Sequence, residues 1–269
     1  MTEKTAKGKL RVGFYGLTGC AGCQLSVLFN ENDILRLFEV IDVAAFPFVR
    51  ERNLDQSFDF VFCEGLVAST TDLETLKKLR EKTPVLVALG ACAHTGCVPA
   101  YRHFTLKENY AHLLYAKDRG ITDLEPTPID SHVKVDYTIP GCPPDKGEIL
   151  SFIKDIVDGK TPRPFNNPVC IECRRNSNLC LLEVGRPCLG PITRGGCDSV
   201  CINGGFECWG CRGMTDDANV AAHVALLGKK GFSREFILER MRSFVGLKLP
   251  AEVEIVFGKS VLHGAKTKH

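Results

Sequence analysis

The sequence has no long hydrophobic run and almost no excess of one charge. Lysine and arginine number 34 and aspartate and glutamate 32 across 269 residues, which gives a net charge of +2. A chain with both signs mixed in this way lacks the basic surface that nucleic acid or an anionic membrane attracts. For that reason we expect no nucleic-acid partner. No stretch of about 18 apolar residues is present, so we also expect no direct membrane insertion.

Several motifs of familiar catalysts and export signals are also missing. The spacing of Gly13, Gly16 and Gly19 does not match the G-x-G-x-x-G fingerprint of dinucleotide-binding folds. Neither a G-x-S-x-G elbow nor a Ser–His–Asp order offers a nucleophile. The first ten residues, MTEKTAKGKL, are polar and resemble neither a secretory nor a twin-arginine signal. We therefore expect a cytoplasmic protein without a nucleophilic active site.

Cysteine, by contrast, is abundant. The chain has 14 cysteines, and eight of them fall between Cys170 and Cys211, in a segment rich in Gly, Pro, Arg and Asn. Such a segment has too few apolar residues to be stabilised by burial, so bonds to sulfur must replace the missing core. Disulfides are rare in a reducing cytoplasm, and the cysteine density therefore indicates zinc or iron–sulfur clusters.

The first part of the chain alternates between strand and helix patterns. Strands are predicted at 10–16, 40–46, 58–63, 84–89 and 133–139, and helices at 26–40, 71–82, 99–116 and 145–157. Thr71 or Asp72 is expected to cap the helix at 71–82. This alternation predicts an α/β fold with a parallel sheet that has helices on both faces.

Four cysteines follow strands of this predicted sheet. Cys20 and Cys23 follow the first strand, Cys92 the fourth and Cys142 the fifth. The carboxyl ends of parallel strands meet at one edge, so these thiols can form a single four-cysteine metal site. Cys20 and Cys23 occupy the first loop, where a flavin phosphate would need Ser, Thr and Gly, so a flavin site in this sheet is disfavoured. Spacing alone does not separate zinc from an iron–sulfur cluster here.

A proline-rich stretch at 161–168, TPRPFNNP, predicts a boundary between a domain at 1–160 and a domain at 161–269. The eight later cysteines make two further groups of four, and three groups in one chain suggest an electron relay. The 34 residues between Cys173 and Cys208 exceed the spacing of a zinc ribbon, although two four-cysteine zinc sites remain possible.

Cys63 and Cys97 are left over and are predicted to be packing residues. Two helices, at 218–227 and 234–245, are predicted to pack on the second domain or on a partner. Asp216 or Asp217 is expected to cap the first of them, and Ser233 the second.

The motifs LTGCAGCQ, CEG, GACAHTG and PGCPP occur in this order, followed by CLLEVGRPCLGPITRGGC and CWGC. Together they resemble the small subunit of nickel–iron hydrogenases over about residues 10–213. The resemblance implies a flavodoxin-like parallel sheet domain, then a small irregular iron–sulfur cluster domain with C-terminal helices. It also implies that the nickel–iron site lies in a separate large subunit.

The resemblance implies three 4Fe–4S clusters, each held by four cysteines. The proximal set is Cys20, Cys23, Cys92 and Cys142. The distal set is Cys170, Cys173, Cys180 and Cys188. The medial set is Cys197, Cys201, Cys208 and Cys211. Periplasmic members have His in place of Cys170 and no cysteine at the position of Cys201. These departures point to the cytoplasmic branch, with its sulfhydrogenase delta subunits and its gamma subunits of deazaflavin-reducing or heterodisulfide-linked enzymes.

The implied function is electron transfer between the nickel–iron site of the large subunit and a partner subunit that carries flavin or iron–sulfur clusters. Glu64 is expected either on a proton path or as a capping carboxylate, and His94 either as a donor to cluster sulfur or as an ordinary loop residue. A quinone-linked subunit of the complex I kind is a rival interpretation, but its cluster loop has adjacent cysteines, which this chain lacks. A zinc-stabilised binding module is the other rival.

Overall fold

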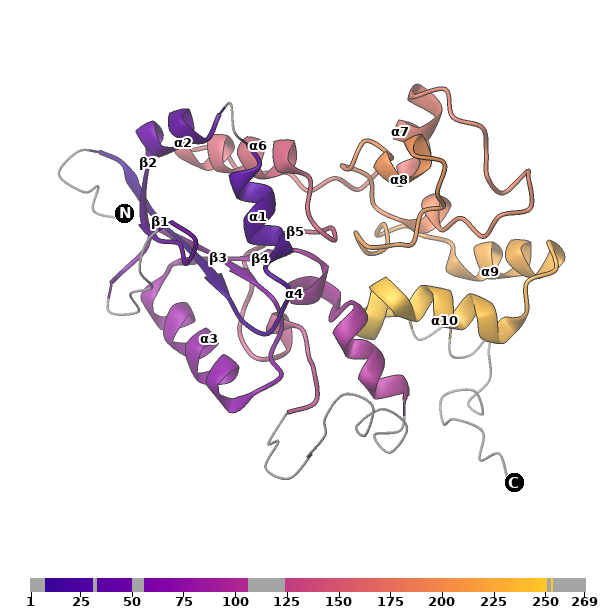
Figure 1. Ribbon diagram of the computed structural model, residues 1–269, viewed down its shortest axis with the longest axis horizontal. Coiled ribbons are helices and arrows are strands. Elements are labelled where there is room, and N and C mark those ends of the chain that lie inside the picture. Colours follow the sequence, from indigo (N-terminus) through magenta and orange to yellow (C-terminus); the bar gives the residue numbers. More distant parts are fainter. Residues whose placement is uncertain (1–7, 31–32, 50–55, 106–123, 251–252, 254–269) are drawn as a thin grey trace. The chain divides into compact units, whose positions relative to one another are not determined.

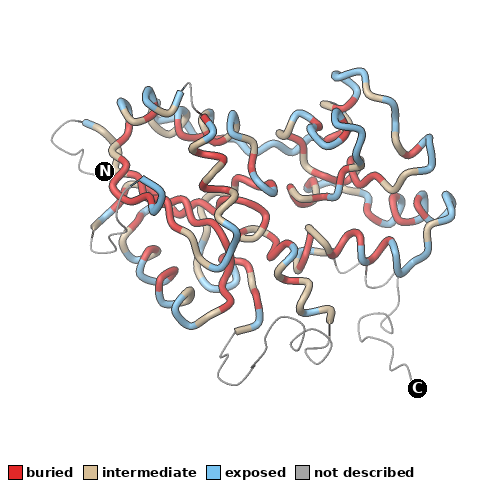
Figure 2. The backbone as a smooth tube through the Cα atoms, viewed as in Figure 1, coloured by how far each residue is buried: buried red, intermediate tan, exposed pale blue. Residues whose placement is uncertain are grey.

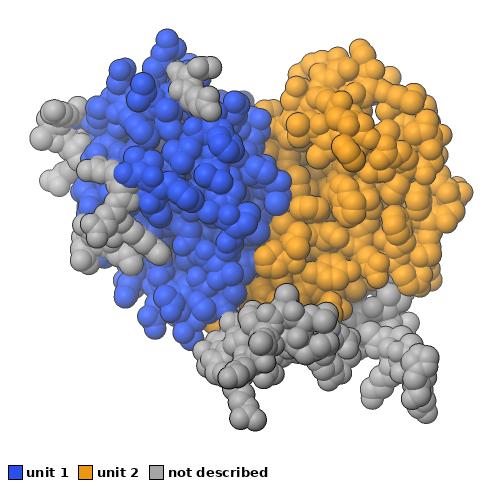
Figure 3. Space-filling model, in the orientation of Figure 1, with its two compact units in different colours: residues 1–94, 127–164 blue, residues 95–126, 165–269 orange. Residues whose placement is uncertain are grey.

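A computed structural model describes residues 8–30, 33–49, 56–105, 124–250 and 253 of the chain (Figure 1). The chain divides into two compact units, coloured separately in Figure 3. Unit 1 comprises residues 1–94 and 127–164, and unit 2 comprises residues 95–126 and 165–269. In the described residues no helix is long and apolar enough to cross a membrane.

Unit 1 is built on a five-stranded sheet in which every neighbouring pair of strands is parallel. The strands are β1 Leu10–Gly16, β2 Ile41–Ala45, β3 Phe60–Glu64, β4 Val85–Leu89 and β5 Tyr137–Ile139. Their spatial order is β2-β1-β3-β4-β5, which is the flavodoxin-like order. From β1 the chain first adds β2 on one side and then β3, β4 and β5 on the other, so the switch point of the topology lies between β1 and β3. The predicted α/β fold is confirmed, although β5 is shorter than the pattern at 133–139 suggested.

Helices cover both faces of this sheet (Figure 1). The longer ones are α1 Gly22–Leu28, α2 Ile34–Val40, α3 Thr70–Lys82 and α6 Lys146–Val157. The short helix α4, Ala91–Thr95, follows β4 and ends at the first residue of unit 2, and a 3-10 helix, η3, spans Ile129–Ser131. Apolar residues of α1, α2 and α6 share one core with alternate strand residues, in which the rings of Phe14 and Phe62 stack 4.9 Å apart. The strands are correspondingly the most buried part of unit 1, as Figure 2 shows.

Two predictions about these helices were wrong. The single helix expected at 26–40 is two helices, because the side-chain amide of Asn30 donates to the carbonyl groups of Ser26 and Val27 at the end of α1. The cap of α3 is Ser69, whose hydroxyl accepts the backbone N–H of Asp72, rather than Thr71 or Asp72.

Unit 2 contains short helices within the cysteine-rich segment and two longer ones after it. Its helices are α7 Val169–Arg175, α8 Val200–Asn203, α9 Val220–Lys229 and α10 Arg234–Val245, with 3-10 helices η1 Val98–Phe104, η4 Gly190–Ile192 and η5 Gly246–Lys248. Both predicted C-terminal helices are present. Ser233 caps α10 as expected, while α9 is capped by Asn219 and not by Asp216 or Asp217. The helix predicted at 99–116 is a 3-10 helix up to Phe104, and most of its remainder lies outside the described residues.

The core of unit 2 joins the cysteine-rich segment to the two C-terminal helices. Buried side chains of α9 and α10 lie in one apolar cluster with residues around η4, including Leu189, Ile192, Leu227 and Met241. The C-terminal helices therefore supply the apolar partner that the cysteine-rich segment was expected to lack, and unit 2 has an apolar core besides its cysteines.

Candidate cluster-binding sites

The proximal set lies where three loops leave the carboxyl edge of the sheet. Cys20 is in the loop after β1, Cys23 in the first turn of α1, Cys92 in α4 after β4, and Cys142 in the loop after β5. The Cys23 thiol interacts electrostatically with the other three. The structure therefore brings these four residues together, as their positions after the strands predicted.

Burial dominates the electrostatics of this site. Cys23 is buried, whereas Cys20 and Cys142 are exposed. Burial, followed by the nearby Glu64 carboxylate and the other thiols, raises the pKa of the Cys23 thiol. A thiolate here needs a positive charge beside it, which a bound metal centre supplies.

Glu64 is part of the wall behind the proximal set. It is 2 % exposed, and its Oε2 accepts the backbone N–H of Gln24 at 2.7 Å. Burial raises the pKa of Glu64, although the backbone N–H groups of Gln24, Ala21 and Cys23 oppose that rise. The carboxylate thus binds the first turn of α1, which is a capping role, and it is not solvated.

One glycine makes close packing around Cys23 possible. Gly90 follows β4 with φ +90°, a left-handed conformation that other residues rarely adopt. A Cβ at this position would collide with the Sγ of Cys23. The backbone at Gly90 therefore leaves room for the buried member of the proximal set.

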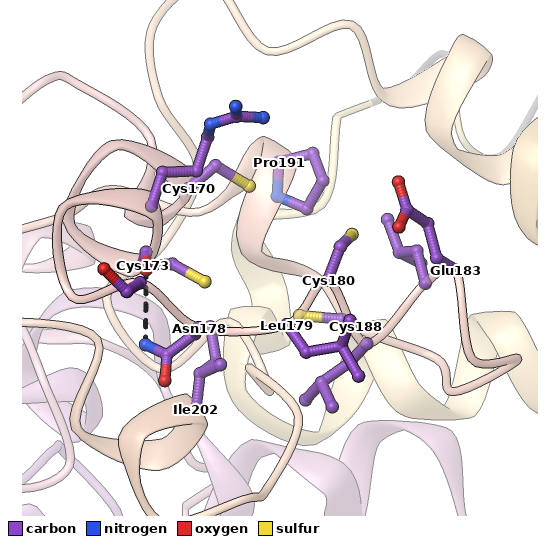
Figure 4. A pocket seen from close by; sticks show the side chains of 13 residues that line it. Cys170, Cys173, Asn178, Leu179, Cys180, Glu183, Cys188, Pro191 and Ile202 are labelled. Carbon is purple, nitrogen blue, oxygen red and sulfur yellow. Dashed lines mark hydrogen bonds between the residues drawn. The ribbon is translucent and has the colours of Figure 1, made fainter.

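The distal set surrounds a cavity of about 490 Å³ (Figure 4). The sulfur atoms of its four cysteines face this space, which is also lined by Asn178 and Ile202. Burial and the three neighbouring thiols raise the pKa of Cys170 to about 11. A single bound water occupies only about 30 Å³, so the cavity has room for a group of many atoms. Across the described residues, no three Cys, His, Asp or Glu side chains are placed to hold a single metal ion.

The medial set is less closely gathered. Cys208 is buried, and its thiol interacts with that of Cys211, while the thiol of Cys201 interacts with Cys188 of the distal set. The backbone N–H of Cys208 lies 3.4 Å from the Sγ of Cys188. The distal and medial sets therefore meet at these two cysteines.

Cys197, the remaining member of the medial set, is held by charged neighbours. Burial raises the pKa of its thiol, and the guanidinium of Arg212 opposes that rise. Arg212 is 1 % exposed and donates from Nε to the carbonyl of Gly195 at 2.6 Å. Glu172 of α7 accepts the backbone N–H groups of Gly196 and Ser199, on either side of Cys197. The loop that carries this cysteine is thus fixed from two directions.

The remaining sequence candidates lie as follows. Cys63 is fully buried within β3 and Cys97 is 1 % exposed, as packing residues would be. His94 is half-buried in α4, and a hydrogen bond to cluster sulfur stays a prediction.

Sequence reasoning missed two polar residues of the C-terminal helices. His223 of α9 is buried and hydrogen-bonds the backbone of Cys188, while burial lowers its pKa and so favours the neutral imidazole. Arg240 of α10 is buried beside Trp209. The only available signal was a charged residue among the apolar positions of a predicted helix, which does not identify the residues that it contacts.

Comparison with known proteins shows which family has this combination of a parallel sheet and cysteine sets. A family model described as the 20 Kd subunit of NADH ubiquinone oxidoreductase matches residues 20–156. The delta subunit of sulfhydrogenase 2 from Pyrococcus furiosus is 36% identical over 236 residues, which cover 87% of this chain and 99% of the relative. A vhu subunit of the F420-non-reducing hydrogenase from Methanocaldococcus jannaschii is 31% identical, with 82% and 89% covered.

Solved structures agree on the fold. A chain of the NAD+-reducing NiFe-hydrogenase in its H2-reduced state superimposes with a TM-score of 0.53 at 30% identity, covering 58% of this chain and 94% of that chain. A chain of the Ni-Fe-Se hydrogenase from Desulfomicrobium baculatum gives a TM-score of 0.54 at 18% identity, covering 76% and 94%.

The α/β sheet domain followed by a cysteine-rich region is the fold of such hydrogenase chains, and the family match and the relatives define the class, an iron–sulfur subunit of an oxidoreductase complex. The chain belongs to the family of the NADH ubiquinone oxidoreductase 20 Kd subunit, and within it to the delta- and gamma-type small subunits of nickel–iron hydrogenases. It is an electron-transfer subunit of a complex that also has a large subunit.

Proposed function

We propose that this chain relays electrons through three 4Fe–4S clusters, held by the proximal, distal and medial sets. The relay connects the nickel–iron site of the large subunit with a partner subunit that carries flavin or iron–sulfur clusters. The observation that carries the proposal is the cavity of about 490 Å³ that the four distal sulfur atoms face, in a chain with two further sets of four cysteines. The domain at residues 1–160 would hold the proximal cluster, and the domain at residues 161–269 would hold the distal and medial clusters.

The residues present fit such clusters in their chemistry. Each set offers four sulfur ligands, the usual number for a cubane cluster. Burial raises the pKa of Cys23, Cys170 and Cys208, so these thiols require a metal centre to become thiolates near neutral pH. When bound, the clusters supply one-electron redox sites. The chain holds them in place and sets the charges and hydrogen bonds around them.

The partner subunit is proposed from chemistry shared by the relatives. Those relatives are described as subunits of a sulfhydrogenase, of F420-non-reducing hydrogenases and of an NAD-reducing hydrogenase. Their electron acceptors differ, but each requires a carrier beyond the hydrogen-splitting site. A flavin- or cluster-bearing subunit meets that requirement because it can collect electrons one at a time.

Iron and acid-labile sulfide, measured anaerobically on the purified complex after subtracting the content of the other subunits, test the proposal. We expect about twelve irons and twelve sulfides for this chain, with electron paramagnetic resonance signals on reduction. Two or three zinc ions with no sulfide would instead identify a zinc-stabilised module and overturn the relay. About four irons would leave the chain with a single cluster and overturn the three-cluster relay.

A further inference from the structure

Helix α10 places one buried cation beside the cysteines of unit 2. Arg240 is 6 % exposed, and its guanidinium carbon lies 3.7 Å from the centre of the Trp209 ring. Its Nη2 lies 3.7 Å from the carboxylate of Glu207. Glu207 and Trp209 flank Cys208 in the sequence, so Arg240 is held against both neighbours of a medial ligand.

The charge of Arg240 is incompletely neutralised. Its Nε and Nη2 are buried and have no hydrogen-bond partner among the described residues. The separation of 3.7 Å from Glu207 is too long for a hydrogen bond. Glu207 also pairs with Arg186 at 2.6 Å, so two cations share a single carboxylate. Buried charges are normally paired and hydrogen-bonded, and such an exception needs a cause.

Two cysteine thiols are also near enough to Arg240 to act on its charge. Cys188 and Cys208 both act electrostatically on its guanidinium. The backbone N–H of Cys208 is 3.4 Å from the Sγ of Cys188, so Arg240 lies where the distal and medial sets meet. Thiolates and cluster sulfides there would accept its N–H groups and balance its charge.

We infer that Arg240 is a positioning residue that raises the reduction potential of the clusters held at Cys188 and Cys208. The inference rests on the proposed function, because it requires clusters in unit 2. Reduction adds a negative charge to a cluster, and a buried cation beside it favours the reduced state. The C-terminal helices thereby take part in electron transfer and do more than cover the cysteines.

Redox titration followed by electron paramagnetic resonance tests this role in the intact hydrogenase complex. Arg240→Met removes the charge and keeps much of the side-chain length. We expect the equilibrium constant for reducing at least one cluster of unit 2 to fall about tenfold or more, which is about 59 mV for one electron. Arg234→Met, at the exposed start of the same helix, is the matched control and should leave every potential unchanged.

Two further variants separate charge from packing. Arg240→Lys keeps the charge and should restore most of the potential. Glu207→Gln removes the neutralising carboxylate and should shift the potential upward, opposite to Arg240→Met. Unshifted potentials in Arg240→Met with full iron content would overturn the inference. If that variant loses iron, the absence of an upward shift in Glu207→Gln would overturn it. A wild-type chain without iron in unit 2 would refute the proposed clusters themselves.

Discussion

At the scale of single residues, Gly90 is the position where the proximal set depends most on the absence of a side chain. It combines φ +90° with a backbone so close to Cys23 that a Cβ would collide with its Sγ. We expect Gly90→Ala to displace Cys23 and to lower the iron content of the complex by about four per chain. Metal analysis of the purified variant measures this loss.

Gly159→Ala is the matched control for Gly90→Ala. Gly159 also has positive φ, +72°, but a Cβ there would meet nothing within 4 Å in the described part of the chain. The control therefore carries the backbone strain without the collision and should retain full iron content. Equal iron loss in both variants would mean that strain alone, rather than the contact with Cys23, disturbs the site.

At the scale of elements, one ion pair joins α3, β4 and the start of β5. Asp136 accepts hydrogen bonds from Arg80 of α3 and from the backbone N–H of Leu86 in β4. Burial opposes ionisation, but these donors outweigh it and lower the pKa of Asp136. We expect Asp136→Asn to reduce the free energy of unfolding by on the order of 2 kcal/mol at pH 7, as for a hydrogen-bonded charge. Anaerobic urea unfolding followed by circular dichroism measures this.

The difference in unfolding free energy between wild type and Asp136→Asn should depend on pH, because the pKa of Asp136 is lowered in the folded state. A carboxyl whose pKa is lower in the folded state stabilises the fold above its unfolded pKa of about 3.9. The difference in unfolding free energy between wild type and Asp136→Asn should therefore stay constant from pH 8 to pH 5 and become smaller only below about pH 4. Asp158→Asn, in an exposed pair with Lys160, should change the stability by at most a few tenths of a kcal/mol. A gap that already closes between pH 8 and pH 5 would contradict this role of Asp136.

Elements with a simple repeating pattern were the ones that the sequence predicted well. The strand β4 is a continuous apolar run and β1 has a buried apolar centre, and the cysteines that follow them had to share one sheet edge. The break between α1 and α2 was not predictable from periodicity, because it depends on the side-chain amide of Asn30. The approach of Cys188 to Cys208 and the burial of Arg240 arise from tertiary packing within unit 2, and no spacing rule encodes either.

At the scale of the whole molecule, the cysteine sets are divided between the two units, so their losses should be separable. The proximal set lies in unit 1, and the distal and medial sets lie in unit 2. Cys142→Ala should remove about four irons and one reduced signal, while the signals of unit 2 persist. Cys180→Ala should remove a different signal, because this cysteine faces the distal cavity.

Cys63→Ala is the control that separates ligands from other cysteines. Cys63 is fully buried within β3 but belongs to none of the three sets, so its replacement should leave the iron content and all signals unchanged. Iron loss in this variant, or full iron content in Cys142→Ala, would contradict the assignment of the proximal set. If Cys142→Ala and Cys180→Ala abolish all signals together, the clusters assemble cooperatively across the chain. The division into two compact units argues against that result, because each unit has its own apolar core to support the sites it carries.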